Sequence, residues 1–156
     1  MSHNHKFLEK TIYKSCLIKK EIVEKDEKEK NIRKVLNLGH TFAHAYEATV
    51  GYNKGLNHGE AVLLGIMSAV EFSRKKNILK KNDFGQIAEH LRTLNYDNLN
   101  KYFKLKDISK IIFYMKQDKK NKDSKINLIL LKSIEKPLLN KSFRENNIRS
   151  FLKTLI

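Results

Sequence analysis

Apolar residues recur every three or four positions along most of this chain, with charged and amide residues between them. This is the period of amphipathic α-helices, and it predicts helices over Phe7 to about Lys25, Asp83 to Leu94 and Asp107 to Lys116. The run that opens at His58 is apolar over most of its circumference, which predicts a buried central helix of about five turns. We therefore expect a mainly α, multi-helix domain.

Two segments near the end of the chain depart from this simple picture. Ile126 to Leu131 (INLILL) is short, apolar and bounded by polar residues, which predicts one strand of a small β-hairpin. Ser142 and Glu145 have the spacing of a capping box and predict the start of a terminal helix. One hairpin leaves the mainly α class unchanged.

Length and composition predict one folded unit. The chain has 156 residues and is 40% hydrophobic, enough for one core, so we expect a single domain over residues 1–156. The single Cys16 excludes an internal disulfide. No apolar run is long enough to span a bilayer, and the start resembles no signal peptide, so we expect a cytoplasmic protein with no membrane partner.

The formal net charge of +15 raises the question of nucleic-acid binding. Lysine far outnumbers arginine, however, and the lysines are spread through every segment rather than gathered in a patch. We therefore predict no nucleic-acid partner. A basic protein of this kind would still suit a small anionic substrate.

One segment concentrates the polar chemistry. If residues 33–47 form one α-helix, then Arg33, Asn37, His40, His44 and Glu47 fall on one stripe, at steps of four, three, four and three. The rest of this helix is mostly apolar. Five polar groups in register favour a functional site over a solvent-exposed face.

The histidines permit two metal sites. His40 and His44 are one turn apart and could share a zinc ion, as in the HExxH motif, although Thr41 stands where that motif has its catalytic glutamate. Alternatively, one of them pairs with His58 across a contact between helices. Either pairing leaves a further ligand to be found.

Three charged residues are further candidates. Glu47 and Glu60 could bind the metal, and Glu60 could equally orient a histidine or cap its own helix. Lys19 lies in the middle of the apolar face of the first predicted helix, where it must reach water, pair or bind an anion.

These residues, taken in order, resemble the C-terminal helical domain of 3-dehydroquinate synthase. The matching elements are Lys19, Asp26-Glu27, Arg33, the run Leu36 to Thr41, His44-Ala45, Glu47, the run His58 to Val62 and Asp118-Lys119-Lys120. The resemblance implies that His40 and His58 are ligands of zinc or cobalt, and that His44 acts on the substrate beside its phosphate. It further implies a catalytic part for Lys19 and Asn37, substrate binding by Lys19, Arg33, Asn37, His44 and Lys119, and acidic site positions at Asp26 and Glu29.

The reaction implied is that of a carbon–oxygen lyase of the shikimate pathway, which serves aromatic amino acid biosynthesis. It converts 3-deoxy-D-arabino-heptulosonate 7-phosphate into 3-dehydroquinate and phosphate, using NAD bound by an N-terminal α/β domain. This sequence has no glycine-rich turn after a strand, so we expect no cofactor-binding residue in it. The third zinc ligand would also lie upstream.

The implied partners are an anionic sugar phosphate and an N-terminal NAD-binding domain or chain, and a homodimer is left open. The chain alone should be inactive. Two alternatives remain: a non-catalytic remnant or binding module that retains zinc or anion binding, and a related sugar-phosphate cyclase.

Overall fold

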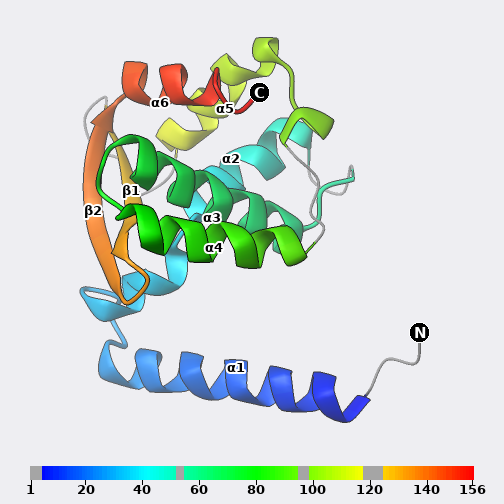
Figure 1. Cartoon of the computed structure of the whole chain (residues 1–156), viewed down its shortest axis with the longest axis vertical. Helices are drawn as coiled ribbons and strands as arrows, with labels where there is room; N and C mark the ends of the chain where they lie inside the picture. Colours follow the sequence, from blue (N-terminus) through cyan, green and yellow to red (C-terminus); the bar gives the residue numbers. More distant parts are fainter. Residues whose placement is uncertain (1–4, 52–54, 95–98, 118–124) are drawn as a thin grey trace. The chain divides into compact units, whose positions relative to one another are not determined.

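The computed structural model describes residues 5–51, 55–94, 99–117 and 125–156 (Figure 1). Contacts divide the chain into two compact units, Met1–Leu36 and Asn37–Ile156, and each is described by itself. The expectation of one domain over the whole chain stays a prediction. No helix among the described residues is long and apolar enough to cross a membrane.

The first unit consists mainly of helix α1 (His5–Lys25), followed by a charged turn. No residue of α1 is buried, and large apolar side chains such as Phe7 and Ile12 are 70% and 55% exposed. Lys19 lies on this exposed helix, so its ammonium can reach water. Its part in substrate binding stays a prediction.

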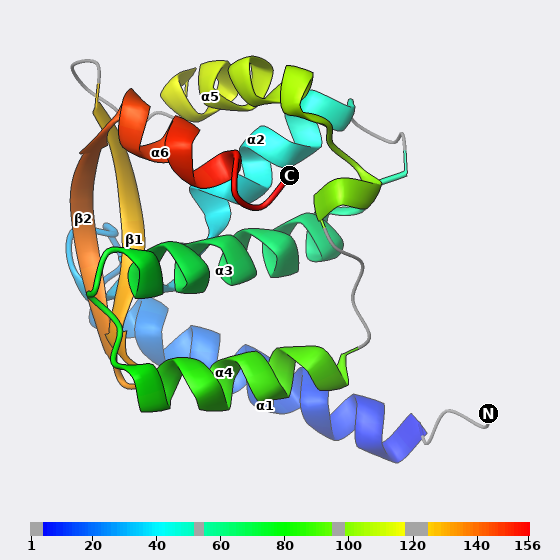
Figure 2. The same cartoon turned by 45° about the horizontal axis from the view of Figure 1, so that its top comes forward.

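The second unit is built around helix α3 (His58–Lys75), which packs against α2 (His40–Val50), α4 (Lys81–Thr93) and the hairpin. Figure 2 shows α3 between α2 and α4. Two further helices, α5 (Ile108–Gln117) and α6 (Glu145–Leu152), contact each other, and α5 also contacts α2. The core of this unit includes the fully buried Phe42, Tyr46, Phe72, Leu64, Ile111 and Ile148. The apolar period thus becomes one packed helical core.

Strands β1 (Lys125–Ser133) and β2 (Lys136–Arg144) form an antiparallel hairpin, as the sequence predicts, and β1 packs on α3. The capping box predicted for Ser142 and Glu145, at the end of this hairpin, is wrong. Ser142 lies inside β2, where its hydroxyl donates to the Asn127 side chain, and α6 has no side-chain cap. The ladder continues to the pair Lys125–Arg144, which keeps Ser142 extended.

The predicted continuous helix over residues 33–47 is also wrong. Residues Ile32–Asn37 form the 3-10 helix η1, and α2 begins only at His40, after Gly39 with a φ of +79°. A Cβ on Gly39 would lie 2.4 Å from the backbone nitrogen of Ile66 in α3. Gly39 therefore combines a left-handed backbone with a close helix contact, and it breaks the register that placed Arg33 and Asn37 in line with His40.

Candidate functional site

Three histidine rings meet where α2 faces the start of α3. His40 and His44 lie one turn apart on α2, and His58 is the first residue of α3. The ring centroids are 5.6 Å apart for His40 and His44, 6.0 Å for His40 and His58, and 6.3 Å for His44 and His58. The structure thus brings together both pairings that spacing alone left open.

The rings of His40 and His58 each have an oxygen acceptor beside Nδ1. Nδ1 of His58 lies 3.1 and 3.2 Å from the two carboxylate oxygens of Glu47, and Nδ1 of His40 lies 3.3 Å from the carbonyl oxygen of Leu38. Carboxylate and carbonyl oxygens only accept, so each Nδ1 donates its proton in these contacts. The lone pair of each neutral ring is then on Nε2.

His44 differs from the other two histidines. Its side chain is exposed, as that of His58 is, but no hydrogen bond joins its ring to another part of the chain that the structure describes. The geometry therefore separates the three rings into two that are oriented through Nδ1 and one that can turn toward a ligand.

The oriented pair fits a metal ion. Metal-binding histidines usually donate their second ring nitrogen to a carboxylate or carbonyl oxygen, as His58 and His40 do, and zinc accepts imidazole ligands readily. Among residues 5–51, 55–94, 99–117 and 125–156, no group of three or more histidine, cysteine, aspartate or glutamate side chains is arranged to hold a metal. These residues thus offer two ligands and need more for a full coordination shell.

Glu60 has a structural contact. Its carboxylate accepts the backbone N–H of Asn57 at 2.9 Å, and the two residues form a capping box at the start of α3. Of the roles left open for Glu60, the structure therefore supports the cap. Glu47, by contrast, points its carboxylate at His58.

A small cavity of about 40 Å³ lies beside the histidines. It is lined by Asn37, His40, Thr41, His44, Asn127, Leu128, Ile129 and Asn140. Asn37 therefore lies beside His40 and His44, although it belongs to η1 and not to α2. Asn127 and Asn140 come from the hairpin and were missed in the sequence, because strand pairing alone decides that they face α2.

The predicted residues Asp26, Glu29 and Arg33 belong to the first unit. The carboxylate of Asp26 accepts the backbone N–H groups of Lys30, Asn31 and Arg33 at 2.9, 2.7 and 3.0 Å, and the Arg33 guanidinium donates to the carbonyl oxygen of Glu27. Asp26 thus organises the turn between α1 and η1. Glu29 lies in the same turn with a φ of +50°. Lys119 lies outside the described residues.

Acid should loosen this turn. Partial burial acts to raise the pKa of Asp26, but the amides of Asn31, Arg33 and Lys30 and the charge of Lys34 outweigh it, so the folded pKa is lowered. A depressed pKa stabilises the turn fully above the pKa of the unfolded chain and loses that contribution as pH falls through the folded pKa. In an NMR titration, the amide signals of residues 30, 31 and 33 should shift together, with a midpoint below that of an ordinary aspartate. Asp26→Asn should abolish the transition, and a midpoint at or above the ordinary value would contradict it.

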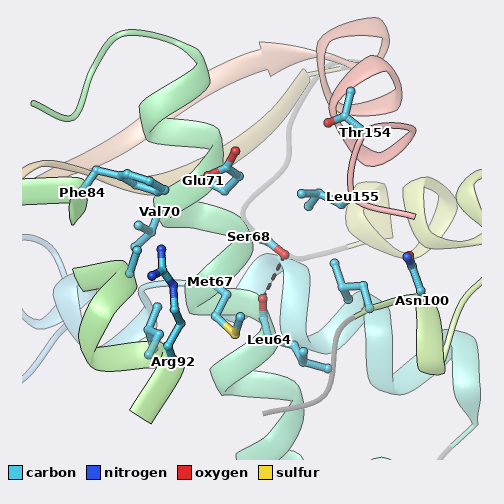
Figure 3. Close-up of a pocket in the computed structure, with 13 residues that line it drawn as sticks. Leu64, Met67, Ser68, Val70, Glu71, Phe84, Arg92, Asn100, Thr154 and Leu155 are labelled. Carbon is cyan, nitrogen blue, oxygen red and sulfur yellow. Dashed lines mark hydrogen bonds between the residues drawn. The ribbon is translucent and has the colours of Figure 1, made fainter. Parts of the chain in front are cut away.

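A larger hollow of 590 Å³ lies away from the histidines, between α3, α4 and the C-terminal residues (Figure 3). Two of its polar groups have partners: Ser68 donates to the carbonyl oxygen of Leu64 and contacts the Tyr46 hydroxyl at 2.8 Å, and Glu71 pairs with Arg74. We assign the candidate site to the histidines because three imidazole rings converge there beside a cavity lined by amides.

Solved structures with the same fold are parts of larger enzymes. The fold matches 2-deoxy-scyllo-inosose synthase complexed with carbaglucose-6-phosphate, NAD⁺ and Co²⁺, with a TM-score of 0.79 and 24% identity over 99% of this chain and 42% of that one. It also matches 2-epi-5-epi-valiolone synthase from Streptomyces hygroscopicus with NAD⁺ and Zn²⁺ bound, with a TM-score of 0.68 and 20% identity over 86% of this chain and 36% of that one. This fold therefore occurs as part of longer chains.

Sequence comparison specifies the family. The family model described as "3-dehydroquinate synthase C-terminal" matches residues 1–121. The 3-dehydroquinate synthase of Pelagibacter ubique is 51% identical over 148 residues, which is 94% of this chain and 40% of that protein. That of Dictyoglomus thermophilum is 39% identical over 142 residues, or 91% of this chain and 39% of that protein. The chain belongs to the 3-dehydroquinate synthase family, as the sequence motifs predicted.

This chain spans about two fifths of the length of the curated relatives it matches. The mainly α class with a small hairpin is confirmed.

Proposed function

We propose that this chain supplies the metal- and substrate-binding half of a 3-dehydroquinate synthase. The observation that carries the proposal is the pair His40 and His58, whose Nδ1 atoms donate to Leu38 and Glu47, the arrangement usual for metal-binding histidines. With their ring centroids 6.0 Å apart, the two histidines would hold zinc or cobalt. A third ligand would come from the part of the enzyme that this chain does not cover.

Each side chain then has a defined task. His44 would exchange a proton with the substrate beside its phosphate. Asn37, in the cavity with His44, would bind a substrate hydroxyl. Lys19, Arg33 and Lys119 would bind the carboxylate and phosphate, where fixed cations orient an anionic substrate. When bound, the metal lowers the pKa of a substrate hydroxyl and so favours its oxidation.

The substrate would be 3-deoxy-D-arabino-heptulosonate 7-phosphate, with 3-dehydroquinate and phosphate as products and NAD bound by the uncovered part. A related sugar-phosphate cyclase is the second candidate, because 2-deoxy-scyllo-inosose synthase and 2-epi-5-epi-valiolone synthase share the fold. A remnant that retains only zinc or anion binding is the non-catalytic alternative. A cytoplasmic location stays a prediction.

A fusion protein tests the proposal. The upstream three fifths of the Pelagibacter ubique relative would be joined to this chain, a reasonable exchange at 51% identity. We expect zinc-dependent phosphate release from the heptulosonate phosphate by the fusion and none by the chain alone. His58→Ala should abolish release, whereas His90→Ala on the exposed face of α4 should not. A soluble, zinc-loaded fusion without turnover would favour the non-catalytic alternative, and turnover of another sugar phosphate only would favour the related cyclase.

A further inference from the structure

The β-hairpin carries an irregularity at the histidine site. Leu128 pairs with Lys141 and Leu130 with Leu138, so both Leu139 and Asn140 lie opposite the single residue Ile129. This two-against-one arrangement is a β-bulge, a feature that redirects side chains and is common next to active sites. The bulge places Asn140 in the wall of the cavity that His40 and His44 line.

Asn140 adopts an uncommon backbone conformation there. Its φ is +54°, in the left-handed region that few side chains other than glycine, asparagine and aspartate accept. Asn77, after α3, has the same φ of 54° but does not line the cavity. A purely conformational role would be served at least as well by glycine, so the two sites can be compared directly.

A second hairpin residue faces the same cavity. The Asn127 side-chain oxygen accepts from the Ser142 hydroxyl, which orients the amide, and its backbone carbonyl accepts from the Thr41 hydroxyl at 3.3 Å. The hairpin is thereby tied to α2. Among the described residues, the polar lining contains amides, imidazoles and a hydroxyl but no carboxylate, lysine or arginine. Such neutral donors suit the oxygen atoms of a phosphoryl or hydroxyl group.

We propose that the hairpin forms a third wall of the site and that Asn140, presented by the β-bulge, donates a hydrogen bond to a ligand oxygen held against His44. Asn127, oriented by Ser142, lines the same wall. This inference rests on the proposed function for the nature of the ligand, a phosphorylated polyol, and adds to it a specificity-determining residue outside the helical motif.

Binding to the full 156-residue chain tests the inference. The probes are inorganic phosphate, glucose 6-phosphate and glucose, followed through the NMR signals of the His44 ring and the Asn140 side-chain amide, with zinc present. Asn140→Gly keeps the backbone conformation but removes the donor, and should weaken binding about tenfold. Asn140→Asp keeps shape and conformation but adds a negative charge, and should weaken phosphate binding further. Asn77→Gly is the matched control and should leave affinity unchanged.

The order of affinities shows whether Asn140 acts as a hydrogen-bond donor or only shapes the backbone. Wild type above Asn140→Gly above Asn140→Asp supports a donor to an oxyanion, and weakening for glucose as well identifies a hydroxyl contact. Equal affinity of wild type and Asn140→Gly overturns the inference, as does failure of wild type to bind any of the three probes. Zinc binding and fusion activity are measured separately, so the proposed function can survive that failure.

Discussion

Gly65→Ala should destabilise the second unit by about 3 kcal/mol, at the upper end of what overpacking usually costs. A Cβ at this position would lie 2.3 Å from the carbonyl oxygen of Gly39 and 2.9 Å from the backbone nitrogen of Ala43. Both are backbone atoms of a neighbouring segment, so no flexible side chain can move aside. The added methyl group must separate α2 from α3.

Gly85→Ala is the matched control within the same unit. Gly85 lies in the middle of α4, and a Cβ there meets no heavy atom within 4 Å. The same substitution should therefore stabilise by about 0.5–1 kcal/mol, because alanine favours the helix. Urea unfolding followed by circular dichroism measures both values. Similar effects of the two substitutions would show that the helix contact is not close.

The two glycine variants also connect packing to the site. Gly65 faces the segment that leads directly into His40, and α3 begins with His58. Separation of the helices should change the distance between these rings, so zinc affinity should fall in Gly65→Ala and not in Gly85→Ala. Stability and ligand geometry thus depend on the same contact.

The sequence predicts the elements of this fold better than their ends. The apolar period identifies the helices and the short apolar run identifies the strand, because both patterns follow directly from burying one face. The start of α2 was missed because one continuous helix was assumed over residues 33–47, through Gly39. A glycine just before the first histidine was the available signal, but its contact with Gly65 depends on residues far apart in the chain.

The site was predictable to a similar degree. The spacing indicated that the histidines cluster. It could not decide whether His40 pairs with His44 or with His58, because the sequence is compatible with both. The contact of Glu47 with His58 and the cap formed by Glu60 depend on the angle between two helices. Asn140 could not be found at all, because a β-bulge is set by pairing between strands and leaves no periodic signal.

Loss of either oriented histidine should weaken zinc binding about a hundredfold. Structural zinc sites with four ligands bind with about 10–16 kcal/mol, so one ligand contributes roughly 3 kcal/mol. His40→Ala and His58→Ala should each show this effect in a competition titration against a chelator. His3 and His5 should be alanine in all variants, because they are another closely spaced pair in the sequence.

Glu47→Gln and His44→Ala distinguish this arrangement from the pairing of His40 with His44. Glutamine keeps the size of Glu47 but not the charge that favours Nδ1–H on His58, so zinc affinity should fall about 10- to 100-fold. His44 lies 5.6 Å from His40 by ring centroids but has no orienting acceptor among the described residues, so His44→Ala should change affinity little. If His44→Ala weakened binding as much as His40→Ala while His58→Ala had no effect, the metal would lie between successive turns of α2. The substrate would then have to be placed beside His58 instead.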